Sequence, residues 1–128
     1  MMAKTRKYRL GDLQLRIMKV LWERGPLAAA EVQEALGGVE LAYTTVATML
    51  RKMETRGLVG HSVDGRRFVY KPIVRPETVT RSMSGDILDR LFEGDLADMV
   101  SHLLTTREVS RGELAQLEQL IARLKRQA

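Results

Sequence analysis

The chain has 128 residues, of which 45% are hydrophobic, enough for one domain with a core or for a small domain with an appendage. It has no cysteine, which excludes disulfides, thiolate metal sites and cysteine nucleophiles, and its net charge of +5 favours an anionic partner. No apolar stretch approaches the roughly 18 residues of a membrane span. Residues 1–7 include basic side chains, but the apolar segment that follows them in a signal peptide is missing. A cytoplasmic protein is therefore expected.

The positive charge belongs to the first part of the chain. Residues 1–75 hold 14 Lys or Arg against 7 Asp or Glu, whereas residues 76–128 hold 7 against 9. A basic part joined to a mildly acidic part indicates two tasks, one of which faces a polyanion. The sequence therefore predicts two regions, residues 1–75 and residues 76–128. Charge alone does not decide whether the first region is a nucleic-acid-binding domain, because many basic proteins bind no anionic partner.

The first predicted elements are two helices. Asp12 is expected to cap the first helix, which ends at Arg24 because a glycine and a proline follow. The second helix is expected at about residues 29–36, where Gly37 and Gly38 stop it. No side-chain cap is expected at its start, because an alanine stands there.

A third helix is expected to begin near Ala42 and to end before Gly57. Its apolar face is expected to be buried and consists of Val46, Met49, Leu50 and Met53. The opposite face carries hydroxyl and cationic side chains. Threonine is an indifferent helix former, so four threonines in one helix indicate selection for something other than helix stability. The alternative is an ordinary solvated helix face.

A β-hairpin follows the third helix. Its strands are predicted at residues 58–63 and 68–71. The turn between them contains an Asp-Gly pair, a strong hairpin signal, and consists of Asp64, Gly65, Arg66 and Arg67. Three helices followed by a hairpin are typical of a winged helix-turn-helix, in which the third helix reads the major groove of DNA and the hairpin reaches the neighbouring minor groove or its phosphates. The DNA contacts predicted from this pattern are Thr44, Thr48, Arg51, Lys52, Thr55, Arg66 and Arg67.

Helical spacing of apolar residues returns after Pro76. A helix that starts there is expected to end before Gly94, a second helical segment follows, and the last helix opens with the capping box from Ser110 to Glu113. The apolar positions predicted to form a dimer surface are Val79, Met83, Ile87, Leu91, Leu96, Val100, Leu114, Leu117, Ile121 and Leu124. The seam of the last helix is too short for a free coiled coil, which favours a dimer interlocked through several helices. The alternative is that these helices close an intramolecular core.

Enzymatic function is not expected. The two histidines, His61 and His102, lie far apart in the sequence and neither has ligand-type neighbours at metal spacing. No glycine-rich phosphate loop or nucleophile motif is present, so the sequence predicts neither a metal nor a cofactor. Two non-enzymatic alternatives remain besides a sequence-specific DNA-binding protein: a winged-helix module that binds protein, and an architectural DNA-binding protein without sequence preference.

A set of short motifs runs through the first part of the chain: Asp12-Leu13, Ile17-Met18, Leu21-Trp22, Glu31-Val32, Leu41-Ala42-Tyr43-Thr44-Thr45-Val46, Thr48-Met49-Leu50, Lys52 and Gly57-Leu58-Val59. This set resembles the penicillinase-repressor family, the BlaI/MecI/CopY group of bacterial winged-helix repressors. The resemblance extends over the whole chain and is most specific in the Tyr-Thr-Thr-Val run. It implies that Tyr43 and Thr45 belong to the DNA contacts as well. It implies a mainly α protein, a winged helix-turn-helix of three helices plus a β-hairpin wing with a C-terminal helical dimerisation region.

The resemblance also implies a function and partners. Such proteins are homodimeric transcriptional repressors that bind a palindromic double-stranded DNA operator, typically with TACA and TGTA half-sites. In the β-lactam-responsive branch a membrane sensor protease signals cleavage of the repressor, often at an Asn-Phe bond, and the corresponding residues here are His102 and Leu103. The copper-responsive branch binds metal through cysteine pairs, which this chain lacks.

Overall fold

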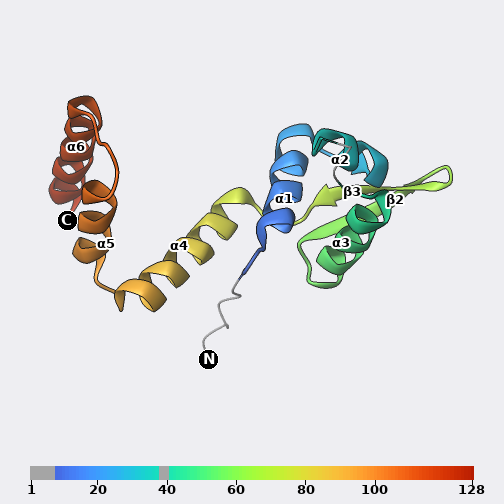
Figure 1. The fold of residues 1–128 in the computed structure, drawn as a ribbon, viewed down its shortest axis with the longest axis horizontal. Coiled ribbons are helices and arrows are strands. Elements are labelled where there is room, and N and C mark those ends of the chain that lie inside the picture. The colour runs from blue at the N-terminus through green and yellow to red at the C-terminus, as the bar shows by residue number, and fades with distance from the viewer. Residues whose placement is uncertain (1–7, 38–40) are drawn as a thin grey trace. The chain divides into compact units, whose positions relative to one another are not determined.

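The computed structural model describes residues 8–37 and 41–128 (Figure 1). The chain forms two compact units, which divide between Gly85 and Asp86. This division by contacts lies inside a helix, and the functional boundary between residues 75 and 76 remains a prediction. Within the described part of the chain, no helix combines the length and the apolar character needed to cross a membrane.

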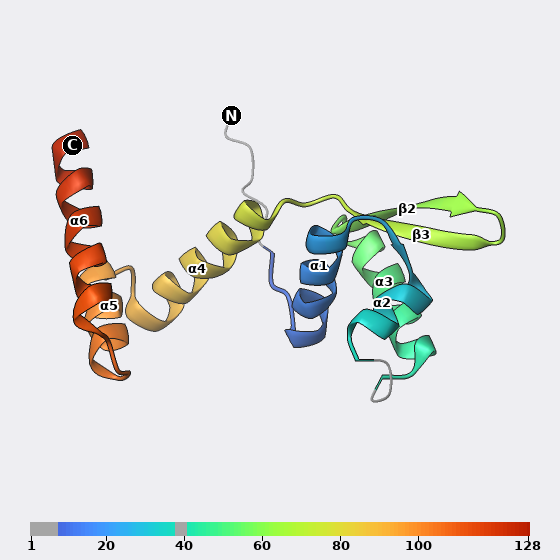
Figure 2. The same cartoon turned by 90° about the horizontal axis from the view of Figure 1, so that it is seen from above.

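The first unit contains three helices and a three-stranded sheet. Its elements in chain order are α1 (Asp12–Arg24), β1 (Leu27–Ala28), α2 (Ala29–Ala35), α3 (Tyr43–Thr55), β2 (Val59–Asp64) and β3 (Arg67–Pro72). Helix α4 (Pro76–Phe92) begins in this unit. The hairpin of β2 and β3 projects beyond α2 and α3, as a wing does (Figure 2). The structure is therefore a winged helix-turn-helix, as predicted from the sequence.

The cap of α1 differs from the prediction. Gly11 is the N-cap, and Asp12 is the first residue of the helix, so the expectation that Asp12 caps it is wrong. The Gly11 N–H donates to Oε1 of Gln14 at 3.1 Å, so this side chain in the first turn supplies the acceptor. The Asp12 carboxylate still favours the helix, because negative charge near the N-terminus complements the helix dipole.

Helix α2 starts without a side-chain cap, as predicted, and ends one residue earlier than predicted, at Ala35. The Ala28 N–H donates to Oε1 of Glu31 at 2.9 Å, which satisfies one backbone donor at the start of the helix. Gly37 has a φ of +106°, a conformation that favours glycine. Gly38, the second glycine of the predicted stop, lies outside the described residues.

The sheet has one strand more than the sequence predicted. Strand β1 pairs antiparallel with β3, with Leu27 opposite Tyr70, and the strand order is β1-β3-β2. The predicted hairpin is confirmed, but its turn is tighter than expected. Asp64 pairs with Arg67 across the hairpin, so only Gly65, with a φ of +65°, and Arg66 form the turn.

The core of the first unit joins all of its helices to the sheet. The side chains that are fully buried, or nearly so, are Ile17, Met18, Leu21, Val32, Val46, Leu50, Met53, Leu58, Val59 and Val79. Met49, which was predicted to be buried, is only half-buried at the edge of this core. The Trp22 indole N–H donates to the Val74 carbonyl at 2.9 Å, and the Tyr8 N–H donates to Oγ of Ser82 at 2.9 Å. These bonds hold the segment after the sheet and the start of α4 against the rest of the unit.

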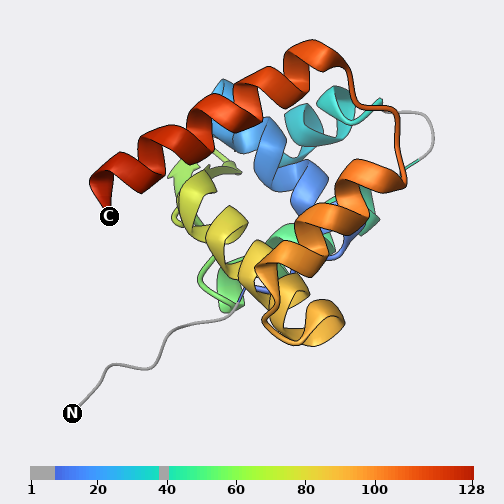
Figure 3. The same ribbon diagram turned by 90° about the vertical axis from the view of Figure 1, so that its left-hand side faces the viewer.

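The second unit consists of helices alone. It contains the end of α4, followed by α5 (Leu96–Thr105) and α6 (Arg111–Gln127) (Figure 3). Glu93 and Gly94 have positive φ angles and end α4, and Oδ1 of Asp95 accepts the Asp98 N–H at 3.0 Å. The predicted capping box of α6 is confirmed, because Ser110 and Glu113 exchange hydrogen bonds of 3.1 and 3.2 Å. The structure describes every residue of the second unit, and none of these residues is buried.

Candidate nucleic-acid interface

Helix α3 presents three of its four threonines on one flank. Thr44, Thr45, Thr48 and Lys52 line a shallow hollow together with Met49. The three hydroxyl side chains are short, so this flank leaves room for a partner to approach the helix backbone closely. This part of the predicted contact set is thus brought together by the structure.

The other flank of α3 faces the wing. Tyr43 and Arg51 line a second cavity of about 370 Å³, and the side chains of Arg66 and Arg67 reach it from the hairpin. Periodicity predicts that Arg51 shares one helix face with Thr44 and Thr48. The structure instead divides the predicted contacts between two flanks, one of hydroxyls with a lysine and one of arginines with a tyrosine.

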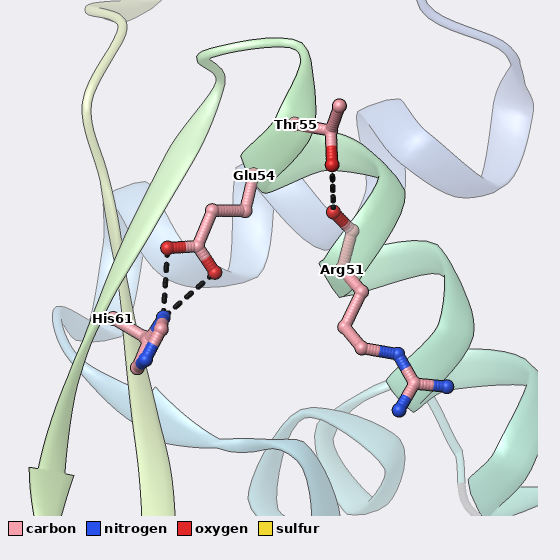
Figure 4. Close-up of polar contacts among 4 residues, drawn as sticks. All are labelled: Arg51, Glu54, Thr55 and His61. Carbon is pink, nitrogen blue, oxygen red and sulfur yellow. Dashed lines mark hydrogen bonds and ion pairs between the residues drawn. The ribbon is translucent and has the colours of Figure 1, made fainter.

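Thr55 is less available than the other threonines. Its Oγ1 donates to the backbone carbonyl of Arg51 at 3.1 Å, one turn earlier in α3 (Figure 4). Such a bond occupies the hydroxyl proton and leaves only acceptor capacity. The Arg51 guanidinium extends away from this bond and lies 3.4 Å from Oγ1 of Thr48.

The two arginines of the wing differ in their surroundings. Arg66 lies in the two-residue turn at the tip of the hairpin. Arg67 lies at the start of β3, where its guanidinium is 3.6 Å from carboxylate oxygens of both Glu31 and Asp64. Exposed ion pairs of this length add little stability, but they place Arg67 against α2. Of these two arginines, Arg66 is therefore the more available to a binding partner.

A contact that the sequence did not reveal ties α3 to the wing. Nδ1 of His61, in β2, lies 2.7 Å from both carboxylate oxygens of Glu54, in α3 (Figure 4). The His61 ring stacks on Phe68 of β3, with ring centroids 4.2 Å apart. The sequence indicates only that His61 has no metal-ligand neighbours, and it names no partner for this side chain. The only available signal was that His61 lies in the first predicted strand, directly after α3.

Tyr70 is one of the residues that line the cavity between α3 and the wing. Burial raises the pKa of the Tyr70 phenol above its usual value of 10.0, and the nearby Glu54 carboxylate raises it further, while Arg51 acts in the opposite direction. The phenol therefore stays neutral at physiological pH, and it adds no negative charge to oppose the arginines.

The predicted dimer positions fall into two groups. Val79 is 2% exposed and belongs to the core of the first unit, and Met83 is half-buried against that core, so the structure gives these two an intramolecular role. The other eight positions lie in the second unit. Leu117 is half-buried, and the exposed ones are Ile87, Leu91, Leu96, Val100, Leu114, Ile121 and Leu124.

His102 and Leu103 lie within α5 and are exposed. The carbonyl of His102, which belongs to the bond between them, accepts the Thr106 N–H at 3.0 Å and the Thr106 hydroxyl at 2.7 Å. The bond is thus part of a hydrogen-bonded helix end. In the part of the chain that the structure describes, no three His, Cys, Asp or Glu residues gather as a metal site would require.

Comparison with known proteins gives a consistent result. The family model described as penicillinase repressor matches residues 10–123. The penicillinase repressor of Bacillus licheniformis is 29% identical over 113 residues, which cover 88% of each chain. The transcriptional regulator BlaI of Mycobacterium tuberculosis is 37% identical over 82 residues, 62% of this chain and 59% of that protein.

Among solved structures, the monomeric form of Bacillus licheniformis BlaI in complex with the blaP half-operator is 28% identical, with a TM-score of 0.48. The match covers 57% of this chain and 90% of that one. The match to the family model is the broader finding, because it spans both compact units. Members of this family are transcriptional repressors and not enzymes, and the chain belongs to the penicillinase repressor family.

Proposed function

We propose that the chain represses transcription as a homodimer that binds a palindromic operator, with TACA- and TGTA-like half-sites, through α3 and the wing. The observation that carries this proposal is the surface of the first unit, where α3 presents a threonine flank on one side and faces an arginine-tipped hairpin on the other. A polyanion with two grooves of different width fits this combination. We therefore place the protein in the cytoplasm, where a bacterial chromosome lies.

The threonine flank supplies the sequence-reading part of the proposal. Thr44, Thr45 and Thr48 are short enough for α3 to lie deep in a major groove while their hydroxyls meet base edges or phosphates. Lys52, one turn beyond Thr48, reaches a phosphate at the edge of the groove. Arg66, at the tip of the hairpin, reaches the adjacent minor groove or its phosphates.

The second unit supports the homodimer. Its helices carry exposed leucines, isoleucine and valine, and its own packing buries none of them. Such a unit gains a core only when a second surface covers these side chains, and a second copy of the chain supplies one by two-fold symmetry. We place the dimer surface on the exposed apolar residues of the second unit and leave Val79 and Met83 out of it, because they pack in the first unit.

Selection from a random duplex pool tests the proposal. The purified protein is expected to enrich a two-fold palindrome with TACA- and TGTA-like half-sites, and the enriched duplex is then bound across a salt series. Binding without enrichment would indicate an architectural DNA-binding protein. The absence of binding at moderate salt would indicate a module that binds protein.

Thr48→Ala is expected to weaken binding to the enriched duplex by about 1–3 kcal/mol and to leave binding to random DNA nearly unchanged. The reason is that a hydroxyl at a base edge distinguishes sequences, whereas a phosphate contact does not. Titration of both duplexes by fluorescence anisotropy measures the two affinities. Thr80→Ala, at an exposed position of α4, is the control and should change neither. Equal losses on both duplexes would rule out base reading by Thr48.

Arg66→Ala is expected to make the salt dependence of binding shallower by about one phosphate equivalent. Adding Arg67→Ala should bring the change to at most about two, because Arg67 is partly engaged by Glu31 and Asp64. Affinities measured over a range of salt concentrations give this slope. Arg75→Ala removes an exposed charge outside the wing and serves as the control. An unchanged slope in both wing variants would remove the wing from the interface.

If repression is released by proteolysis, the candidate cleavage site must first unfold locally. We retain the bond between His102 and Leu103 as the candidate cleavage site, and a membrane sensor protease system as its candidate trigger. Proteases bind extended backbone, and the bonds from Thr106 to the His102 carbonyl hold this segment helical. The end of α5 must therefore unwind before cleavage.

A further inference from the structure

The cavity between α3 and the wing has an unusual lining. Three arginines, three aromatic residues and four alanines surround about 370 Å³, and no acidic side chain is among these lining residues. The alanines are residues 28–30, at the start of α2, and Ala47 in α3. Such a lining provides positive charge, flat apolar walls and free space at one place.

The position of the cavity matches the path that a DNA strand takes along a winged helix. If α3 lies in the major groove and the wing lies in the adjacent minor groove, the sugar–phosphate strand that separates these grooves must pass between the two elements. The cavity occupies this place, with Tyr43 and Arg51 on the α3 side and Phe68 on the wing side.

We propose that this cavity seats one sugar–phosphate unit of the DNA backbone, with Arg51 and Arg66 at the phosphate and the exposed ring of Phe68 against the deoxyribose. This inference rests on the proposed function and adds a sequence-independent contact to it. Arginine suits a phosphate because its planar guanidinium donates several parallel hydrogen bonds. A sugar ring offers apolar edges that pack on aromatic side chains.

The walls of the cavity are held in place by contacts already described. Tyr70 is buried and belongs to the core, so its ring forms a fixed wall. The stacking of His61 on Phe68 and the contact of His61 with Glu54 tie the wing to α3. Glu54 and His61 are therefore positioning residues, which set the width of the cavity without touching the DNA.

The small side chains keep the cavity open. Ala30 is exposed and lies in the first turn of α2, so a larger residue there projects into the space without disturbing the core. The contact is made to the backbone and not to base edges, so blocking it should affect all DNA sequences alike. This distinguishes the cavity from the threonine flank, where Thr48→Ala acts on the enriched duplex alone.

Ala30→Leu in the full chain tests the proposal. Its affinity for both the enriched duplex and a random duplex is expected to fall by about tenfold or more, with an unchanged melting temperature. Ala115→Leu makes the same substitution at an exposed position of α6 and should leave both affinities unchanged. Wild-type affinity of Ala30→Leu for both duplexes would overturn the proposal and leave the proposed function intact, whereas a wild-type chain that binds no DNA would overturn both.

A second measurement locates the phosphate. In the enriched duplex, each phosphate is replaced in turn by a neutral methylphosphonate. The expected result is one position in each half-site, between the two grooves, at which wild-type protein loses about tenfold in affinity and Arg51→Gln loses much less. Equal losses in both proteins at every position would overturn the assignment. Saturable binding of free thymidine 5′-monophosphate that Ala30→Leu abolishes, with DNA affinity unchanged, would assign the cavity to a free nucleotide and also overturn it.

Discussion

Leu50→Ala is expected to lower the free energy of unfolding by about 2–5 kcal/mol. Leu50 is fully buried and stands with Val46 and Met53 on the side of α3 that packs into the core. Truncation removes apolar contacts and leaves a void that neighbouring elements fill only in part. A small domain has only about 5–15 kcal/mol of stability in total, so this single change removes a large share of it.

Urea unfolding followed by the fluorescence of Trp22 measures this loss. The indole is half-buried, and its N–H is bonded to the Val74 carbonyl, so its signal reports the packing of the first unit. Ile73→Ala is the control, because this side chain is 55% exposed and its truncation should change stability by less than about 0.5 kcal/mol. Equal losses for the two variants would contradict the assignment of Leu50 to the core.

The helices and the hairpin were predictable because their signals are local. The apolar spacing of α3, the box from Ser110 to Glu113 and the Asp-Gly turn of the wing each depend on residues a few positions apart. Each pattern has a physical cause that acts within one turn of chain, such as a side chain that satisfies a nearby backbone donor. The structure confirms the helices and the hairpin, although Met49 is only half-buried and the turn is limited to Gly65 and Arg66.

Features that depend on distant partners were not predictable in this way. Strand β1 has only two residues, and it exists because Leu27 and Ala28 meet the free edge of β3. Nothing in its local sequence distinguishes it from a loop. Val79 has helical spacing like the apolar residues that follow it, but only tertiary packing shows that it belongs to the first unit.

The candidate site shows the same limit. Periodicity predicted which side chains lie on the outer side of α3. It could not predict which other elements lie beside each flank of the helix. The structure adds the wing and the start of α2 on the side of Arg51, and with them the cavity and the contact between Glu54 and His61. Residue types indicated DNA, whereas the proposed separation of roles, with threonines at base edges and arginines at the DNA backbone, rests on which elements lie beside each flank.

If the chain is the homodimer that we propose, Ile121→Arg is expected to convert it to a monomer and to weaken binding to the palindromic duplex by about 100-fold or more. Ile121 lies on the seam of α6 and is 52% exposed within one chain, so a charge there meets the proposed partner without entering a core of its own chain. Covering an unpaired charge with apolar side chains is strongly unfavourable, which separates the two copies. Each protomer then binds one half-site alone and loses the high effective concentration that linkage provides.

Sedimentation velocity gives the oligomeric state, and titration of palindromic and half-site duplexes gives the affinities. The half-site duplex is the decisive comparison, because a variant with an intact first unit should bind it as one wild-type protomer does. Gln119→Arg adds the same charge on the opposite side of α6 and should remain dimeric. If Ile121→Arg also remained a dimer with full affinity for the palindrome, the exposed apolar residues of α6 would not form the interface, and the end of α4, where Leu91 is 72% exposed, would become the surface to change.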